Sequence, residues 1–347
     1  MKAAYLYGIR DLRVEEADRP ALGGQDEVLI RVLAVGVCGS DCHFYERGRI
    51  GKYVVKKPLI LGHEASGEVV EVGSAVKHLK PGDQVAIEPG VPCRRCRFCK
   101  SGRYNLCAEE VVFMGTPPWD GAFREYVSWP ADFVFRLPEG VSAEQAALVE
   151  PLAVGMQAVR RGSVGVGDSV AVLGCGPIGL VSLQCAAGAG ATRLLATDVI
   201  PFRLEAARRL GAQAFDASAA DSVNAVRDAT GGGPDVVIET AGTVQTIQQS
   251  FRMVRPGGVV VLVGMPPEDE FAAPVLDIIM REYDVRGVFR YVNCFPPALA
   301  LLAAGRIDTD LLITHRFPLE QAQAAIEFTL EHKETAIKVL VKPGASA

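Results

Sequence analysis

The chain has 347 residues, enough for about two domains, and its 49% hydrophobic and 22% charged residues are typical of a globular protein and not of a disordered or collagen-like one. Thirty-six Lys and Arg residues against 41 Asp and Glu residues leave a net charge of -5, so the basic excess of a nucleic-acid-binding or anionic-membrane-binding protein is missing. Apolar stretches stay far shorter than the roughly 20 residues of a membrane span, and Arg10 and Asp11 precede any signal-peptide core, so we expect a cytoplasmic protein.

An alternating apolar run at residues 28–34 predicts a strand, and side chains that could bind a metal or transfer protons follow it. Cys38 follows this strand, and residues 37–43 bring together thiol, hydroxyl, carboxylate and imidazole groups. Taken alone, a cysteine such as Cys38 is more often a buried structural residue than a ligand.

A second group lies at His63 and Glu64, between Gly62 and a strand-like run at residues 69–72. Successive side chains of a strand face opposite ways, so these two residues could share one metal only in a turn, which Gly62 permits. Glu150 comes later, after an apolar segment of helical type and directly before a proline. By itself His63 is more often a hydrogen-bonded histidine, and Glu150 is more often a surface charge at a helix end.

Together these dispersed residues match a pattern of metal chemistry. One thiolate, one imidazole and one or two carboxylates, with a place left for water or substrate, are typical of a catalytic zinc site. Spacing alone does not show that the four residues meet, so their joint occurrence is the support for this hypothesis. The candidate ligands are Cys38, His63, Glu64 and Glu150.

A compact set of four cysteines lies between His63 and Glu150. Four thiolates can converge tetrahedrally on one zinc ion at about 2.3 Å, and such a closed site is structural because no position stays open. An iron–sulfur cluster, which also uses short cysteine spacings, and a chance group of free thiols are the alternatives. In a cytosolic chain, cysteines indicate ligands or thiols more than disulfides. The four are Cys93, Cys96, Cys99 and Cys107.

A strand, a glycine-rich turn and a helix follow in residues 169–173, 174–179 and 180–187. This is the context that the dinucleotide-binding fingerprint requires. The first glycine makes the tight turn, the second lets the backbone approach the pyrophosphate, and the third lets the helix pack on the strand; the helix N-terminus supplies free N–H groups. A tight turn without a ligand is the alternative. The three glycines are Gly174, Gly176 and Gly179.

A second strand of this unit, residues 193–197, ends at Asp198. A carboxylate there accepts hydrogen bonds from the ribose hydroxyls and repels a 2′-phosphate, which favours NAD over NADP. Arg203 is the nearby cation that could weaken this preference. Further apolar runs at 235–239 and 258–264, with helical segments between them, predict a doubly wound parallel sheet of the α/β class. The last run is open to two interpretations, central core or an edge strand at a subunit interface.

The chain resembles the zinc-dependent medium-chain dehydrogenases, and within them the polyol (sorbitol or xylitol) dehydrogenases. The resemblance covers nearly the whole chain, from about residue 36 to residue 320. Glu150 stands where the alcohol-dehydrogenase branch has a cysteine, which favours the polyol branch. The segments that carry the resemblance are 48–51, 56–67, 76–83, 86–90, 102–106, 150–152, 287–291 and 314–320, of which the last two are most telling.

The resemblance implies a split architecture. Residues 1–151 would form a GroES-like, β-rich catalytic domain, residues 152–287 a Rossmann NAD-binding domain, and residues 288–347 would return to the catalytic domain. The cofactor would lie between the domains with the catalytic zinc at its base. The family also implies a homotetramer.

The resemblance further implies roles at the metal and in proton transfer. Glu150 would hold the zinc-bound water or bind the metal itself. Ser40 and His43 would relay the proton, with Ser40 beside the metal-bound oxygen and His43 nearer solvent. The direct ligands of the catalytic zinc would be Cys38, His63 and Glu64.

For the substrate and the cofactor, the resemblance implies that Arg290 and Tyr291 orient the polyol hydroxyls. Animal sorbitol dehydrogenases have a tyrosine where this chain has Phe44, so one hydroxyl contact would be absent or supplied by Tyr45. Those enzymes also lack the complete four-cysteine lobe, so the second zinc belongs to the wider superfamily pattern. Besides the three glycines, the NAD site would be lined by Ile178, Asp198, Arg203, Val263, Met265 and Phe289.

The implied reaction is oxidation of a polyol to a ketose, with hydride passing to NAD and the proton leaving through Ser40, the cofactor ribose and His43. One alternative is a zinc NAD dehydrogenase for another secondary alcohol or L-threonine, against which the cationic Arg290 speaks. A noncatalytic protein that binds nucleotide and zinc is a remote alternative. The sequence does not rank the polyols.

Overall fold

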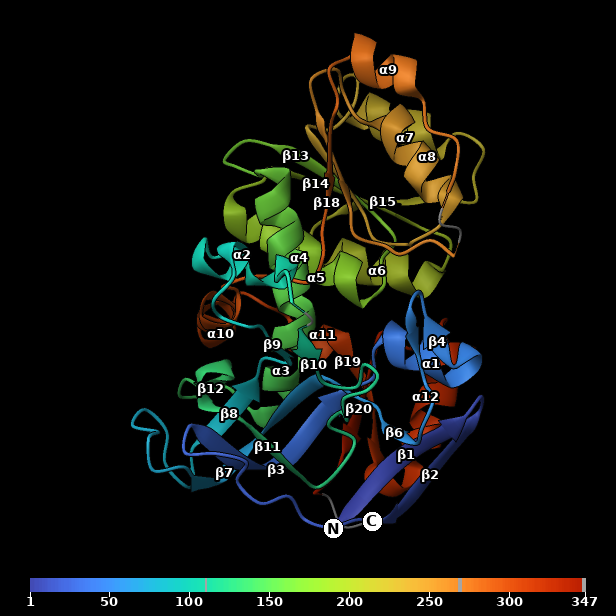
Figure 1. The fold of residues 1–347 in the computed structure, drawn as a ribbon. Coiled ribbons are helices and arrows are strands. Elements are labelled where there is room, and N and C mark those ends of the chain that lie inside the picture. The colour runs from blue at the N-terminus through green and yellow to red at the C-terminus, as the bar shows by residue number, and fades with distance from the viewer. Residues whose placement is uncertain (110, 268–269, 345–347) are drawn as a thin grey trace. The chain divides into compact units, whose positions relative to one another are not determined.

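The computed structural model describes residues 1–109, 111–267 and 270–344, and the chain divides into two compact units (Figure 1). The first unit joins Met1–Glu150 to Phe295–Ala347, and the second is Pro151–Cys294. The chain therefore leaves the first unit once and returns to it. The return falls at Phe295 and not at the expected residue 288, which makes Arg290 and Tyr291 part of the second unit.

In the described residues, the first unit is built on a seven-stranded sheet of order β12-β8-β7-β3-β20-β19, with β11 also paired to β3. The pairs are antiparallel except for β19 and β20, which run parallel. The strands are β3 (Glu27–Gly36), β7 (Glu64–Val72), β8 (Gln84–Ile87), β11 (Tyr126–Pro130), β12 (Val134–Arg136), β19 (Ile313–Pro318) and β20 (Lys338–Lys342).

Strand β3 lies at the centre of this unit because β7, β11 and β20 all pair with it. The four residues of its predicted apolar face, Val28, Ile30, Val32 and Ala34, are fully buried, and Leu29 and Val35 on the other face are buried as well. Smaller sheets complete the unit, with strands β1 (Lys2–Gly8), β2 (Asp11–Glu16), β4 (Arg49–Ile50), β5 (Tyr53–Val54), β6 (Leu59–Ile60), β9 (Gly90–Val91) and β10 (Val112–Phe113).

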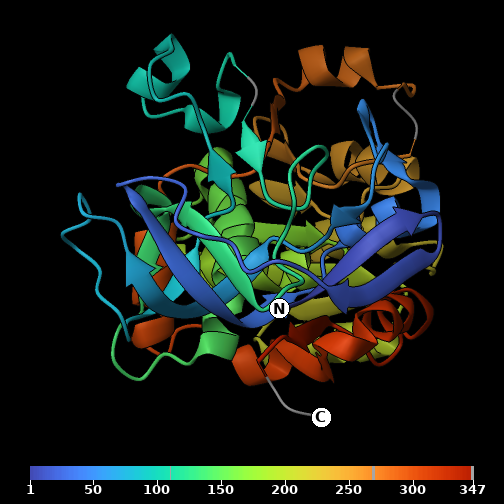
Figure 2. The same cartoon turned by 60° about the horizontal axis from the view of Figure 1, so that its bottom comes forward.

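Short helices close the ends of these strands, and the four-cysteine segment around α2 projects from the sheet as a separate lobe (Figure 2). Within the described residues, no helix is both long and apolar enough to span a membrane. The helices of the first unit are α1 (Gly39–Arg47), α2 (Arg97–Lys100), η1 (Tyr104–Leu106), η2 (Ala131–Phe133), α3 (Ala143–Ala147), α10 (Phe295–Ala303), α11 (Thr309–Leu312), η3 (Leu319–Gln321) and α12 (Ala322–Glu331), and α4 (Val149–Gly162) crosses into the second unit.

Among its described residues, the second unit holds a six-stranded sheet of order β15-β14-β13-β16-β17-β18, parallel throughout. Every residue of β13 is buried, as expected for a parallel strand covered on both faces. The predicted doubly wound α/β class is confirmed. The strands are β13 (Ser169–Leu173), β14 (Arg193–Asp198), β15 (Gln213–Asp216), β16 (Val236–Glu239), β17 (Val259–Leu262) and β18 (Asp284–Gly287).

Helices α5 and α6 pack on one side of this sheet and α7 and α8 on the other (Figure 1). The strand order reverses between β13 and β16, and ligands of such sheets bind at the carboxyl ends of the strands at this switch point. The helices are α5 (Pro177–Ala189), α6 (Pro201–Arg209), α7 (Ser222–Ala229), α8 (Val244–Met253) and α9 (Val275–Met280).

The two interpretations of the run at 259–263 are now resolved. Strand β17 lies between β16 and β18, so this run is central core and its alternative, an edge strand, is wrong. The edge strands of this sheet are β15 and β18, and β18 follows the exposed helix α9.

Candidate metal centres and dinucleotide site

Three of the four candidate catalytic ligands meet in the first unit. One ligand atom from each of Cys38, His63 and Glu64 lies within 4.8 Å of the other two. Cys38 is the N-cap of α1, His63 follows the turn at Gly62, and Glu64 is the first residue of β7. The cluster therefore forms where β3 ends and β7 begins.

Two glycines allow this close approach. Gly62 has a φ of +87°, which favours glycine, and a Cβ atom there would lie 2.7 Å from the Phe123 ring. Gly36 pairs with Glu64 across β3 and β7, and a Cβ atom at Gly36 would overlap the Glu64 carboxylate. Gly36 thus makes room for the Glu64 side chain, and Gly62 lets the turn before His63 pack against Phe123.

A buried lysine, Lys338, holds the carboxylate of Glu64. Its Nζ donates hydrogen bonds to Oε1 and Oε2 of Glu64 at 2.8 and 2.7 Å and to the carbonyl oxygen of Val37 at 3.0 Å. Both side chains are almost completely buried, at 3% and 1% exposure. Sequence reasoning missed this residue, although a lysine inside the apolar run at residues 336–341 was a signal that could have found it.

Asp41, which is also absent from the sequence prediction, ties the two ligand segments together. It is fully buried, and its Oδ2 accepts the Cys38 N–H at 2.9 Å while its Oδ1 accepts the Gly62 N–H at 3.0 Å. Its carboxylate lies 3.8 Å from Nδ1 of His63. A carboxylate in this place orients a metal-binding imidazole, so Asp41 fits the outer shell of a metal site.

The electrostatics of the cluster favour a cation. Burial alone would lower the pKa of His63, but the Cys38 thiolate and the Asp41 carboxylate outweigh it and raise that pKa to about 10. Thiolate, imidazole and carboxylate are the donors that zinc prefers, and a divalent ion would neutralise the negative groups gathered here. The residues present therefore fit a zinc ion.

Glu150 lies near this cluster but outside it. It is a buried residue in the first turn of α4, and its charge raises the pKa values of His63 and Lys338. The group of ligand atoms within 4.8 Å of one another consists of Cys38, His63 and Glu64. This arrangement favours an outer role for Glu150, towards water or substrate, over direct metal binding.

The two candidate relay residues, Ser40 and His43, lie on α1 close behind Cys38. His43 is half-buried, and this burial lowers the pKa of its imidazole below the ordinary 6.5; the nearby Arg47 lowers that pKa further. The ring is therefore neutral at neutral pH and able to accept a proton.

This state of His43 predicts a pH dependence. Oxidation of the substrate should slow as the pH falls through the lowered pKa, because the protonated ring no longer accepts a proton. We expect His43→Ala to reduce kcat by about a hundredfold or more and to flatten the acidic side of the pH profile. The measurement is kcat against pH for both proteins, and an acidic side that the substitution leaves intact would exclude His43 from the relay.

The candidate substrate contacts on α1 are placed differently from expectation. Phe44 and Tyr45 are both buried, and the Tyr45 hydroxyl donates a hydrogen bond to Oε1 of Glu327 on α12. Of the two expectations for this contact, absence or supply by Tyr45, the engagement of the Tyr45 hydroxyl with Glu327 favours absence.

The four cysteines of the lobe form the second candidate metal centre, with their Sγ atoms all within 4.8 Å of one another. The Sγ–Sγ distances are 3.9 Å for Cys93 and Cys99, 3.5 Å for Cys96 and Cys99, and 4.0 Å for Cys96 and Cys107. A tetrahedral ion with bonds of about 2.3 Å separates its sulfur atoms by roughly 3.8 Å. The distances therefore fit one zinc ion.

The lobe is anchored to the rest of the first unit through Tyr104, which lies between the third and fourth cysteines. The Tyr104 hydroxyl donates a hydrogen bond to Oε1 of buried Glu88 at 2.7 Å, and its ring contacts the edge of Phe133. Burial raises the pKa of Glu88 to about 7. Arg94 adds an ion pair with Asp132 at 3.0 Å.

We expect zinc to hold the lobe in its folded form. Cys96→Ser removes one thiolate from the centre, and the lobe should then open locally, because structural zinc sites contribute folding free energy directly. Trypsin cleaves after Arg and Lys, of which the lobe has several between its cysteines. Cleavage inside residues 93–107 should become at least about tenfold faster in Cys96→Ser, with Ser101→Ala as control. Equal cleavage rates in all three proteins would exclude a zinc-held lobe.

In the second unit, the glycine-rich turn joins β13 to α5. Gly174 has a φ of +91°, and a Cβ atom there would lie 2.9 Å from Ala241. A Cβ atom at Gly179 would overlap the carbonyl oxygen of Gly174, so this glycine allows the helix to pack on the turn. The space over Gly176 is open, with Arg203 as the neighbour at 3.9 Å. The backbone N–H groups at the N-terminus of α5 can therefore be approached closely, as binding of a dinucleotide phosphate requires.

Asp198 closes this turn from the end of β14. Its Oδ2 accepts the Cys175 N–H at 2.6 Å, and its Oδ1 accepts the Ile200 N–H at 2.9 Å. Within the described residues, Nε of Arg203 is buried without a hydrogen-bond partner. An orphaned guanidinium nitrogen beside an open glycine fits a bound anionic cofactor.

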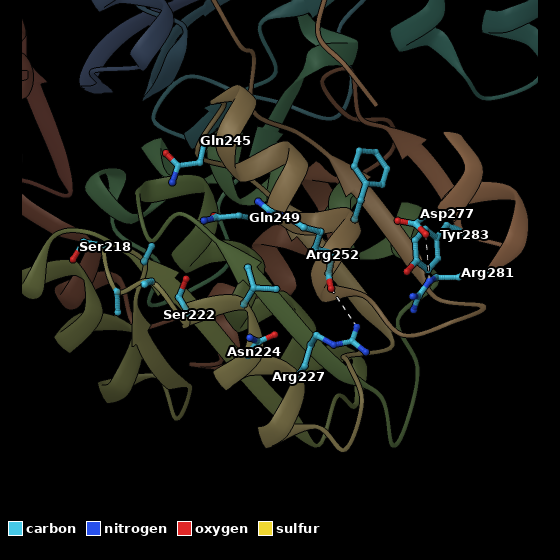
Figure 3. Close-up of a pocket in the computed structure, with 15 residues that line it drawn as sticks. Ser218, Ser222, Asn224, Arg227, Gln245, Gln249, Arg252, Asp277, Arg281 and Tyr283 are labelled. Atoms are coloured by element: carbon cyan, nitrogen blue, oxygen red, sulfur yellow. Dashed lines mark hydrogen bonds and ion pairs between the residues drawn. The ribbon is translucent and has the colours of Figure 1, made fainter. Parts of the chain in front are cut away.

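Of the remaining candidate residues of the second unit, Ile178 lies in the first turn of α5 and the others lie on loops. Met265 and Phe289 are exposed, Val263 and Ile178 are half-buried, and the Arg290 guanidinium lies 4.9 Å above the Phe289 ring. Tyr291 is buried. A cavity of 580 Å³ between α7, α8 and α9 contains none of these residues among its described lining, which is largely polar (Figure 3).

Comparisons with known proteins agree with this geometry. Family models describe residues 24–139 as an alcohol dehydrogenase GroES-like domain and residues 177–304 as a zinc-binding dehydrogenase. The sorbitol dehydrogenase of Bacillus subtilis (strain 168) is 45% identical to this chain over 345 residues, which is 99% of this chain and 97% of the relative.

Solved structures with similar folds match over 99% of both chains. One is an oxidoreductase/dehydrogenase of unknown specificity from Escherichia coli, with a TM-score of 0.93 and 37% sequence identity. Another is the 2R,3R-butanediol dehydrogenase from Bacillus subtilis, with a TM-score of 0.90 and 36% identity.

Proposed function

The chain belongs to the zinc-dependent medium-chain dehydrogenases, in the branch of the sorbitol dehydrogenases, and from this premise we propose that it oxidises a polyol to a ketose with NAD. The observation that carries the proposal is the group of partly buried Cys38 with buried His63 and Glu64, and with Lys338 bound to Glu64. Bound zinc would lower the pKa of the substrate hydroxyl, and bound NAD would accept the hydride.

The residues of the chain contribute binding and proton transfer. Glu150, buried near the cluster, would hold water or a substrate hydroxyl. Ser40 and His43 would carry the proton towards solvent, which the neutral state of His43 permits. Arg290 and Tyr291 would orient the polyol hydroxyls, and Asp198 would accept hydrogen bonds from the ribose and favour NAD over NADP.

The experiment is NADH formation with a panel of polyols, 2R,3R-butanediol, ethanol and L-threonine, on protein whose zinc content has been measured. Oxidation of polyols that is lost on chelation and restored by zinc is the expected result. Activity confined to butanediol or threonine would place the chain in a neighbouring branch. Binding of zinc and NADH without turnover of any alcohol would overturn the catalytic assignment.

We also propose that the chain works as a homotetramer in the cytoplasm. Helix α9 exposes the apolar side chains of Val275, Leu276, Ile279 and Met280, and it precedes the edge strand β18. Apolar side chains beside an open strand edge are typical of subunit interfaces. None of the nine cysteines, all of which lie in the described residues, forms a disulfide, as in a reducing compartment. Light scattering of the purified protein tests the assembly.

A further inference from the structure

A carboxylate without an assigned role, that of Glu239, is buried at the carboxyl end of β16. Its Oε1 accepts hydrogen bonds from the Gly242 N–H and from the Thr246 hydroxyl, each at 2.8 Å. The side chain is fully buried, and among the described residues its Oε2 has no hydrogen-bond partner that meets ordinary geometry. Burial raises the pKa of Glu239, while nearby backbone N–H groups oppose this effect. A buried carboxylate with an unpaired oxygen lowers the stability of the fold, which indicates that Glu239 has a role other than stabilisation.

Two loops meet directly above this carboxylate. Gly242 has a φ of +68°, and a Cβ atom there would lie 3.0 Å from the backbone of Met265. A Cβ atom at Gly264 would lie 2.8 Å from Oε2 of Glu239 and would overlap the Gly242 backbone. The loops after β16 and β17 therefore pack backbone against backbone, with Glu239 beneath both of them.

The same strand end also holds the glycine-rich turn. The Thr240 hydroxyl donates hydrogen bonds to the carbonyl oxygens of Leu173 and Gly174, at 3.0 and 2.8 Å. The backbone carbonyl of Glu239 accepts the N–H groups of Val263 and Gly264, at 2.9 and 3.1 Å. Glu239 and Thr240 thus connect the loops that follow β13, β16 and β17. These loops lie at the switch point of the sheet, where ligands of doubly wound sheets bind.

We propose that Glu239 is a positioning residue for the dinucleotide, one that sets the loop after β16 against the loop carrying Val263 and Met265. The proposal rests on the proposed function, because it assumes that NAD occupies this edge. Glu239 does not touch the cofactor, since its side chain is fully buried. Its carboxylate acts by helping to fix Gly242 and Gly264 in close contact, together with the main-chain hydrogen bonds at the end of β16.

Asp235 is a matched control at the opposite end of the same strand. Its carboxylate accepts the Ser169 N–H and hydroxyl, at 2.8 and 2.6 Å, and pairs with Arg255 at 2.7 Å. It therefore joins neighbouring strands much as Glu239 does, but at the amino end, where parallel sheets do not bind their ligands. Removal of either carboxylate should lower the stability of the protein. Only removal of the Glu239 carboxylate should weaken cofactor binding.

The experiment compares NADH affinity, measured by fluorescence titration, with melting temperature in the wild-type protein, Glu239→Ala, Glu239→Gln and Asp235→Ala. We expect Glu239→Ala to weaken NADH binding by about tenfold or more, the size typical of a lost outer partner. Glu239→Gln keeps one acceptor oxygen and should recover part of this loss. Asp235→Ala should lower the melting temperature while NADH affinity stays within about twofold of wild type.

Two results would overturn the inference while leaving the proposed function intact: NADH affinity unchanged in Glu239→Ala, or an equal loss in Asp235→Ala. If the wild-type protein itself fails to bind NADH, the proposed function falls and this inference falls with it. A raised KM for NAD in Glu239→Ala, with kcat for the polyol less affected, would separate positioning from general damage, because a misfolded fraction lowers kcat alone.

Discussion

Replacement of Cys38 by serine is expected to remove the metal of the catalytic cluster and to reduce polyol oxidation by at least about three orders of magnitude. A serine hydroxyl stays protonated at neutral pH and binds zinc far more weakly than a thiolate does. The loss corresponds to roughly 4 kcal/mol of transition-state stabilisation, within the range that a Lewis-acid metal supplies. The measurements are zinc content per chain and kcat/KM for the best polyol.

Cys42→Ala is the matched control for this substitution. Cys42 lies one helical turn further along α1 and is buried, and burial raises the pKa of its thiol well above the ordinary range. It is outside both groups of candidate ligands, so its replacement should leave zinc content unchanged. If Cys38→Ser retains its zinc and its activity, the cluster at the start of β7 is not the catalytic metal centre.

Replacement of Lys338 by methionine should produce the largest loss of stability. Methionine has a similar length but no charge, so the Glu64 carboxylate would stay buried without the cation that now holds both of its oxygens. Breaking a buried ion pair on one side lowers the free energy of unfolding by about 3–5 kcal/mol. We also expect weaker zinc binding, because Glu64 would lose its fixed orientation.

Lys342→Met provides the comparison on the same strand. Lys342 lies four residues further along β20 and pairs with Glu144 at 2.6 Å, where both side chains are partly exposed. Such a pair contributes less than about 1 kcal/mol. Urea unfolding of the two variants and the wild type measures the difference. A Lys338→Met protein as stable as Lys342→Met would mean that Glu64 has another counter-charge in the fold.

Local patterns of the sequence were sufficient to predict the second unit and the four-cysteine lobe. The glycines at 174–179 and the cysteines at 93–107 are close in sequence, so their spacing already limits the geometry that they adopt. A strand, a tight turn and a helix follow from such spacing, and so does a four-thiolate cluster.

The catalytic cluster depended on contacts that no spacing reveals. Cys38 and Glu64 meet because Gly36 pairs with Glu64 across β3 and β7, and Lys338 reaches Glu64 from β20, which is 274 residues away in the chain. The position of the Tyr45 hydroxyl has the same origin. The hydroxyl is directed by Glu327 on α12, a helix from the far end of the sequence. Strand register and long-range packing decide which side chains meet, and a single sequence carries little information about either.

The return of the chain to its first unit has a consequence for biosynthesis. The ribosome completes Cys38, His63 and Glu64 first, then the whole of Pro151–Cys294, and Lys338 emerges only after both. Until then Glu64 lacks its lysine, and β3 lacks its neighbour β20. The second unit is continuous and has what it needs to fold during translation. A nascent chain that stops short of β20 would therefore carry a folded nucleotide-binding unit and an incomplete metal centre. The metal centre would be completed when β20 joins the sheet.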